Sequence, residues 1–281
     1  MHVPRGASLR LRRWAVVLWL VATAAALSCA RETRPQLVLV TTTSVANAGL
    51  LEQLLPRYER EHGVRFGVHA VGSGRALQML AVGDGDVAIS HAPEAETTAL
   101  RQHPQWWYRK IMFNDFLLVG PPDDPAQVRA AGSLDEALRR IAASTVGFVS
   151  RADQSGTHER ERALWAGVGT QPTHVLPTGQ GMAVTLRIAA ERGAYTLTDR
   201  GTWNHRPKAL PLAVVNEGDP RLLNTYAVIV GTTDLRDAAL AFARWLADGE
   251  GRQAIAAVPG FRLWPVELPR TDPAALPLPR R

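Results

Sequence analysis

The sequence predicts an α/β fold built in two lobes. Short apolar runs of strand length alternate with longer stretches in which apolar residues recur every three or four positions. About 240 residues remain once an export signal is set aside, more than one hydrophobic core usually holds. A Pro/Asp-rich stretch at 120–125 interrupts the chain midway. These observations favour two lobes with mostly parallel sheets.

The first 28 residues are typical of an export signal and not of a folded element. Four arginines, with no acidic residue among them, precede the apolar run 14–27, which is too short and too Ala-rich for a membrane span. Cys29, the single cysteine, follows directly, so we expect lipid attachment there after cleavage. The alternative is simple secretion with an incidental cysteine, since Ala26 departs from the usual lipid-attachment signal. Residues 29–36 would form a linker.

The charge balance argues against a nucleic-acid partner. The formal net charge is +6, and four of those charges belong to the signal arginines, which leaves 6 − 4 = +2 for the mature chain. No block of Lys and Arg with interleaved aromatic residues is present. Together with the export signal, this predicts an extracytoplasmic domain, periplasmic or on the cell surface, that does not bind nucleic acid.

The elements are predicted in chain order from these patterns. Strands are expected at 37–40, 66–71, 87–90, 116–119, 146–149, 210–215 and 226–230. Helices are expected at 50–58, 75–82, 158–166, 182–192 and 235–247, because apolar residues recur there on one helical face.

The lobes follow from where the chain crosses between them. We interpret the strands at 116–119 and 226–230 as the two crossings, which makes the first lobe discontinuous. Lobe I would span 37–120 and 224–268, and lobe II would span 121–223. Residues 269–281, rich in Pro and Arg, would form a tail without fixed structure.

Four hydroxyl residues in a row, Thr41-Thr42-Thr43-Ser44, connect the first strand to the first helix. A helix N-terminus carries partial positive charge and free N–H groups, so its natural guest is an anion. The alternative is that Thr43 or Ser44 only caps the helix. One cap needs one hydroxyl, and the run has four.

Three later segments share this design of strand, small or hydroxyl residues, then helix. They are Gly72-Ser73-Gly74, the run from Ser150 to Thr157, and Gly179-Gln180-Gly181-Met182. In the second of these, Arg151 can present a fork of donors to oxyanion oxygens, with Ser155, Gly156 and Thr157 on the other side. The alternative makes Arg151 a surface ion pair with Asp153 or Glu159, and Ser155 only a cap.

Enzymatic and metal readings are weaker. Ser155 and His158 lie three positions apart with Asp153 nearby, but a serine hydrolase usually shows a Gly-x-Ser-x-Gly elbow, and none is present. The histidines are scattered without a metal-ligand spacing. We therefore expect no catalytic residue and no metal site.

Taken together, these segments resemble the TupA-type tungstate-binding proteins, the solute receptors of ATP-driven oxyanion importers. The matching runs are Thr-Thr-Thr-Ser at 41–44, Ala-Val-Gly-Ser-Gly at 70–74, Gly-Asp-Val at 85–87, His-Ala-Pro at 91–93, Phe-Asn-Asp-Phe at 113–116, Val-Gly-Pro at 119–121, Ser-Arg-x-Asp-x-Ser-Gly-Thr-His at 150–158, Gly-Gln-Gly-Met at 179–182, Tyr-Thr-Leu-Thr-Asp-Arg-Gly-Thr at 195–202, Asn-Glu-Gly-Asp-Pro at 216–220 and Asn-Thr-Tyr at 224–226.

The resemblance implies a two-lobed type II periplasmic-binding-protein fold with a central ligand cleft. It implies tungstate or molybdate as ligand, no cofactor, a monomer, and a membrane permease with its ATPase as partners. Carried over position by position, the ligand-binding residues would be Thr42, Thr43, Ser44, Ser73, Arg151, Ser155, Gly156 and Thr157. The family usually has Gly where Ala152 stands and Thr where Ser73 stands, and Ala183 and Val184 also differ from the family pattern, which puts a contact from the 179–182 loop in doubt.

Two other functions stay open at this point. A phosphate receptor of the same fold would need a carboxylate to accept the proton of hydrogen phosphate, and Asp153 or Asp199 would have to serve. A serine hydrolase would use Ser155. Tungstate and molybdate carry no proton at neutral pH, so their site should be rich in donors.

Overall fold

The computed structural model describes residues 35–277. The predicted signal at 1–28, Cys29, most of the linker and residues 278–281 lie outside this range. The described strands are β1 (Gln36–Thr42), β2 (Arg65–Val71), β3 (Val87–Ser90), β4 (Trp107–Gly120), β5 (Phe148–Ser150), β6 (Val175–Pro177), β7 (Tyr195–Asp199), β8 (Ala213–Asn216), β9 (Leu223–Val230) and β10 (Arg262–Leu263).

The helices lie between these strands. They are α2 (Thr43–Ala46), α3 (Leu50–His62), α4 (Ser73–Val82), α5 (Pro93–Gln102), α6 (Leu134–Ala143), α7 (Gly156–Val168), α8 (Met182–Arg192), α9 (Arg200–His205), α10 (Arg236–Ala247) and α11 (Gly251–Ala256), with 3-10 turns at Val128–Ala130 and Pro220–Leu222. Within residues 35–277, none of the helices combines the length and apolar character needed to cross a membrane.

The strands of residues 36–277 join in one open sheet, in the order β2-β1-β3-β9-β4-β7-β5-β6, with β8 and β10 paired to β4 beside this path. The outer pairs β1 with β2 and β3, and β5 with β6 and β7, are parallel. In the centre, β9 is antiparallel to β3 and β4, and β4 is antiparallel to β7. The α/β class is therefore confirmed, but the expectation of mostly parallel strands is wrong at the centre, because the chain leaves along β4 and returns along β9.

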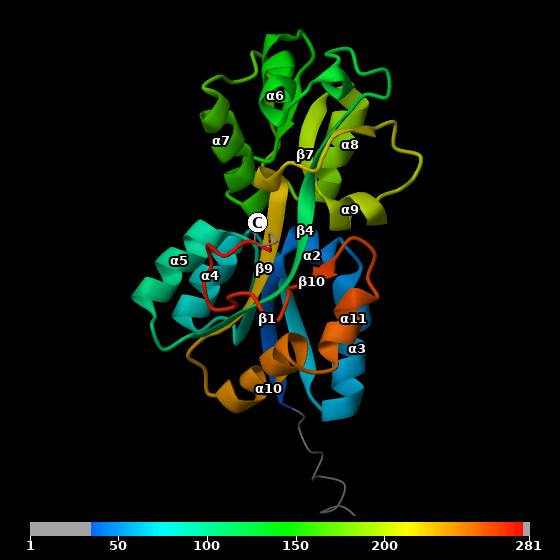
Figure 1. Ribbon diagram of the computed structural model, residues 1–281. Coiled ribbons are helices and arrows are strands. Elements are labelled where there is room, and N and C mark those ends of the chain that lie inside the picture. Colours follow the sequence, from blue (N-terminus) through cyan, green and yellow to red (C-terminus); the bar gives the residue numbers. More distant parts are fainter. Residues whose placement is uncertain (1–34, 278–281) are drawn as a thin grey trace, which may run out of the picture. The chain divides into compact units, whose positions relative to one another are not determined.

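Strand β4 belongs to both halves of this sheet (Figure 1). Its residues 107–115 pair with β9, and its residues 116–119 pair with β7. We call β1, β2, β3, β9, β10 and the first part of β4 the first half, and the rest of β4 with β5 to β8 the second half. The segments predicted as crossings, 116–119 and 226–230, lie in β4 and β9.

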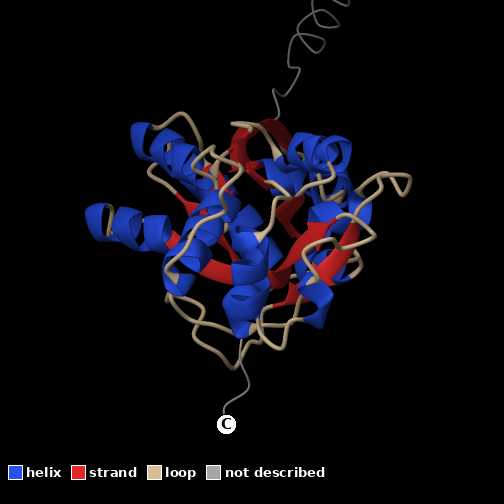
Figure 2. Cartoon of the chain, turned by 90° about the horizontal axis from the view of Figure 1, so that it is seen from above, coloured by secondary structure: helices blue, strands red, loops and turns tan. Residues whose placement is uncertain are grey.

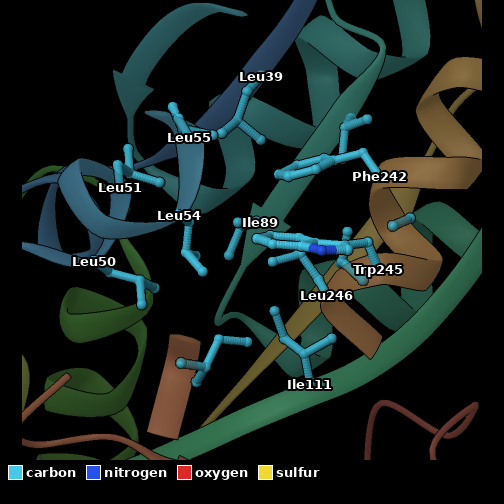
Figure 3. Close-up of a cluster of buried hydrophobic side chains, with 14 of the residues drawn as sticks. Leu39, Leu50, Leu51, Leu54, Leu55, Ile89, Ile111, Phe242, Trp245 and Leu246 are labelled. Atoms are coloured by element: carbon cyan, nitrogen blue, oxygen red, sulfur yellow. The ribbon is translucent and has the colours of Figure 1, made fainter. Parts of the chain in front are cut away.

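Helices lie on both sides of the sheet (Figure 2). Each half has a hydrophobic cluster on either side, to which these helices contribute. In the first half, the leucines of α3 face Phe242 and Trp245 of α10 across Ile89 of β3 (Figure 3). These side chains are buried, and burying one such side chain contributes about 1.5–3 kcal/mol. The strand ends are thus held rigidly, and the functional segments follow directly from them.

The C-terminal segment is not a free tail. The Lys110 backbone N–H donates to the Arg270 carbonyl at 2.8 Å, and Lys110 Nζ donates to the Ala275 carbonyl at 2.9 Å. Arg270 also pairs with Asp248 at 2.6 Å. The expectation of a tail without fixed structure is wrong for residues 270–275, because the buried Lys110 ammonium needs acceptors and this segment provides one.

Candidate functional site

The hydroxyl run lies where β1 ends and α2 begins. Thr42 is the N-cap of α2, and its hydroxyl accepts the Val45 N–H at 3.3 Å. The hydroxyl oxygens of Thr42 and Ser44 lie 3.0 Å apart and both residues are buried, whereas Thr43 is partly exposed. A cap is therefore present, but Thr42 supplies it, and neither Thr43 nor Ser44 is used for it.

The run from Ser150 to Thr157 forms the facing segment. Strand β5 ends at Ser150, and Ala152 (φ +46°) and Gln154 (φ +58°) both take the left-handed conformation. This tight loop brings Ser155 to the N-cap of α7, where its hydroxyl accepts the His158 N–H at 3.3 Å. Alternating left-handed residues make a concave backbone that suits an anion.

Arg151 joins the two segments. Its side chain is only 1% exposed, and its Nη2 donates to Thr43 Oγ1 at 3.3 Å and to the Asp153 carboxylate. The other Asp153 oxygen accepts the Ser155 N–H at 3.1 Å. The predicted alternative of an Arg151–Asp153 ion pair is thus real, but Arg151 is buried, Asp153 is partly buried, and Arg151 also contacts Thr43.

Glycines at three positions allow the predicted segments to pack closely against one another and against His91. A Cβ on Gly156 would lie 2.5 Å from the His91 carbonyl oxygen, and one on Gly72 would lie 3.4 Å from the Asp153 carbonyl oxygen. A Cβ on Gly181, the N-cap of α8, would lie 3.5 Å from the Thr43 Cβ. All four predicted strand-to-helix segments therefore meet around Thr43 and Arg151.

Several donors in this cluster have no partner among the residues that the structure describes. They are Arg151 Nε, Arg151 Nη1 and the Thr157 hydroxyl, all buried. A buried charged N–H without an acceptor is costly, more so than a neutral one. The arrangement is what an anion with several acceptor oxygens would satisfy.

His91 lies in the same cluster, although it was not predicted as a site residue. Its Nε2 is 3.2 Å from Ser44 Oγ, its Nδ1 is 3.0 Å from Asn224 Oδ1, and its backbone N–H donates to Ser73 Oγ at 3.4 Å. Burial lowers the His91 pKa to about 4, and the nearby Arg151 charge acts in the same direction, so the ring is neutral at pH 7. The signal in the sequence was its place directly after β3, at the sheet edge that also carries Thr42.

The two carboxylates considered for a phosphate receptor are both engaged. Asp199 caps α9: its oxygens accept the Thr202 N–H at 2.9 Å and the Thr202 hydroxyl at 2.7 Å. Burial raises the Asp199 pKa. Asp153 binds Arg151 and the Ser155 N–H as described above.

The hydrolase geometry is not formed in the described residues. The Ser155 hydroxyl pairs with the backbone N–H of His158, and the His158 Nδ1 accepts the Gln154 N–H at 3.1 Å. The imidazole is therefore not directed at the Ser155 hydroxyl, as a general base would be. Residues 35–277 also hold no group of three His, Cys, Asp or Glu side chains placed to bind a metal ion.

The fold and the two-sided donor cluster define a class of protein, the binding proteins of the periplasmic-binding-protein type. Residues 24–250 match the PBP superfamily domain. A tungstate-binding protein TupA from Peptoclostridium acidaminophilum is 36% identical over 233 residues, which cover 80% of this chain and 82% of the relative. The TupA of Campylobacter jejuni is 37% identical over 193 residues, covering 66% of this chain and 71% of the relative.

Solved structures agree with these relatives. The tungstate ABC transporter structure from Geobacter sulfurreducens is 36% identical, with a TM-score of 0.70 over 79% of this chain and 97% of that one. TupA from Desulfovibrio alaskensis G20 is 35% identical, with a TM-score of 0.66 over 82% of this chain and 98% of that one. The chain therefore belongs to the PBP superfamily and, within it, to the family that includes these TupA proteins.

Proposed function

We propose that this chain is the extracytoplasmic receptor of an ABC importer and that it binds tungstate, with molybdate as a second ligand. The observation that carries the proposal is Arg151, which is almost fully buried and has two N–H groups without an acceptor among the described residues, next to the unpartnered Thr157 hydroxyl. A tetrahedral dianion has acceptor oxygens for all three and requires no proton acceptor.

The number of available donors is adequate for tight binding. Besides Arg151 and Thr157, the hydroxyl protons of Thr43 and Ser155 and the first backbone N–H groups of α7 lie in the cluster. Hydrogen bonds to a charged group contribute roughly 1.5–3 kcal/mol each, and nanomolar affinity needs about 12 kcal/mol. About six such bonds would suffice before the costs of ordering are subtracted.

The ligand would be held between two lobes. We assign residues 37–115 and 224–268 to lobe I and residues 116–223 to lobe II, which moves the expected boundary from residue 120 to the point where β4 changes its partner from β9 to β7. Thr43 and Arg151 then come from opposite lobes. The sheet supports this assignment, because residues 107–115 of β4 pair with β9 and residues 116–119 pair with β7, and each half has its own hydrophobic clusters. Anion binding would bridge the lobes and shift the population toward the closed form, which the permease and its ATPase would recognise.

The route to the membrane follows from the N-terminal sequence. Cleavage before Cys29 and lipidation of its thiol would tether a monomeric receptor beside its permease. No cofactor and no catalytic step enter this function.

Titration calorimetry tests the proposal. The full mature chain should bind tungstate tightly and molybdate measurably, with phosphate and sulfate at least about 100-fold weaker, a difference of roughly 2.7 kcal/mol. Thermal unfolding should shift upward with tungstate, because ligand at 100 times Kd stabilises the folded state by about 2.7 kcal/mol. Equal affinity for phosphate would support the phosphate-receptor alternative instead.

A further inference from the structure

His91 occupies the centre of a buried chain of hydrogen bonds that starts in the hydroxyl run. Thr42 Oγ1 lies 3.0 Å from Ser44 Oγ, which lies 3.2 Å from His91 Nε2, and His91 Nδ1 lies 3.0 Å from Asn224 Oδ1. The ring also stacks on Tyr226, with 5.1 Å between the centroids. These hydrogen bonds connect β1, α2 and β9 next to the donor cluster.

The position of the His91 proton follows from the neighbours of Asn224. The Asn224 amide donates to Asn114 Oδ1 at 2.9 Å and to the Tyr226 hydroxyl at 2.8 Å, so its own Oδ1 is left to accept from His91 Nδ1–H. The buried ring is neutral and has one proton. Nε2 therefore presents a lone pair, and the Ser44 hydroxyl donates to it.

This assignment changes what the hydroxyl run can offer an anion. The Ser44 proton is used on His91, and the Thr42 proton is then directed at Ser44 Oγ. Of the three hydroxyl residues predicted to bind in this run, Thr43 is the one whose proton stays available, and it faces Arg151. The Ser44 hydroxyl therefore acts on the site through its contact with His91.

On its other side, His91 abuts the facing segment. Its carbonyl oxygen and its ring edge lie so near Gly156 that a Cβ there would be 2.5 Å and 2.9 Å from them, respectively. Gly156 is the first residue of α7, next to Ser155 and Thr157. One residue thus contacts both sides of the donor cluster.

We propose that His91 is a positioning residue of the anion site: its ring fixes the Ser44 hydroxyl, and its carbonyl supports the first turn of α7, so that the donors of the two segments are held at one spacing. This inference rests on the proposed function, because the spacing matters only if an anion binds between the segments.

A matched pair of substitutions separates the two ring nitrogens. The Gln side chain of His91→Gln can place its carbonyl oxygen where Nε2 lies and still accept the Ser44 proton, whereas that of His91→Asn reaches only the Nδ1 position. We expect His91→Gln to keep tungstate affinity within about threefold and His91→Asn to lose at least about tenfold. His103→Asn, which removes a ring stacked on Trp106 in another region, is the control and should leave the affinity unchanged.

A double-mutant cycle tests the route through Ser44. Ser44→Ala should weaken tungstate binding by about the same factor as His91→Asn. The combined variant should bind no more weakly than either single variant, because both substitutions break the same Ser44–His91 hydrogen bond. Fully additive losses, or equal affinities of His91→Asn and His91→Gln, would overturn the proposal.

A spectroscopic readout keeps the proposal testable without ligand. In ¹⁵N-labelled protein, NMR should show the His91 proton on Nδ1 at pH 7, and the Nε2 resonance should move in Ser44→Ala. A proton on Nε2 would overturn the positioning role even if tungstate binds. Failure of the wild-type chain to bind tungstate would instead overturn the proposed function, so the two failures are distinguishable.

Discussion

At the scale of single residues, the Arg151 guanidinium is the group with the largest expected effect on the ligand. It contributes a positive charge and two unpartnered donors in a buried position. Arg151→Ala should weaken tungstate binding at least about 100-fold, since charge-assisted hydrogen bonds contribute roughly 1.5–3 kcal/mol each. Arg151→Lys should fall between, because it keeps the charge and loses the planar fork.

Calorimetry on both variants checks this ranking. Arg139→Ala, which removes an exposed arginine from α6, is the matched control and should bind like the wild type. If Arg151→Lys bound as tightly as the wild type, charge alone would explain the role of Arg151 and its geometry would not matter.

Ala152 carries local strain beside this arginine. Its φ of +46° places a Cβ in the left-handed region, which costs about 1–2 kcal/mol for a residue other than glycine. Ala152→Gly should relieve that strain and raise Tm by roughly 1–3 °C, because part of the gain is offset by the greater freedom of glycine in the unfolded chain.

Differential scanning calorimetry measures the Tm of Ala152→Gly and of Gly169→Ala, which makes the opposite change at another left-handed position. Gly169 ends α7 at φ +67°, with no atom within 4 Å of the Cβ position, so Gly169→Ala should lower Tm for conformational reasons alone. An unchanged or lower Tm in Ala152→Gly would show that the loop is not strained.

At the scale of elements, α7 and the end of β3 meet so closely that only glycine fits between them. A Cβ at Gly156 would lie 2.5 Å from a backbone oxygen, which cannot move away without displacing β3. Gly156→Ala should therefore hold the two segments apart, weaken tungstate binding at least about tenfold, and reduce the ligand-induced decrease of the radius of gyration in X-ray scattering.

A second glycine of the same helix is the control for this effect. Gly167 has no atom within 4 Å of its Cβ position, so Gly167→Ala should stabilise α7 by about 0.5–1 kcal/mol and leave the affinity unchanged. Comparable losses of affinity in both variants would mean that Gly156 acts through helix stability and not through contact with His91.

The elements that the sequence predicts well are those with a clear apolar period. Strands β1 and β3 and helices α4, α8 and α10 lie within two residues of their expected bounds. Strand β4 begins nine residues before the expected start, because its first part contains Arg109 and Lys110, whose partners come from elsewhere. Lys110, for example, donates to Thr225 Oγ1 at 2.7 Å. Such partners are invisible to a local pattern.

The candidate site likewise has a part that the sequence predicts and a part that it does not. The strand, hydroxyl, helix order identified all four segments that meet around Thr43 and Arg151, because the order itself builds free N–H groups and hydroxyls at one sheet edge. It did not identify His91, because the role of that ring depends on Asn224, 133 positions away. Long-range polar partners set the role of a buried side chain, and periodicity does not encode them.

At the scale of the whole molecule, the contact between the two halves makes the stability of the protein depend on pH. A cavity of about 90 Å³ next to the donor cluster is lined by Glu94 of α5 and by Glu159 and Arg160 of α7, among others. Burial, reinforced by the charges of Glu94 and Glu96, raises the pKa of Glu159 to about 7, and the arginines at 160 and 162 oppose this shift. Two carboxylates from different halves thus face each other.

The sign of the effect on stability follows from the raised pKa. The folded state binds the Glu159 proton more tightly than the unfolded chain, whose Glu pKa is 4.5, so the contribution is complete below that value and is lost as pH rises through about 7. Glu161 follows the same direction, since burial raises its pKa to about 7. His91, with its lowered pKa, acts in the opposite direction between about 4 and 6.5.

Comparing Glu159→Gln with the wild type isolates this one carboxylate, because Glu161 and His91 titrate in both proteins. The amide cannot ionise, so the Tm advantage of Glu159→Gln over the wild type should be larger at pH 8 than at pH 5, by about 2 °C or more. Glu191→Gln, which removes an exposed carboxylate of α8, is the matched control for the substitution. A constant Tm difference between pH 5 and pH 8 would mean that Glu159 is already ionised at pH 5 and that the facing carboxylates are screened by solvent.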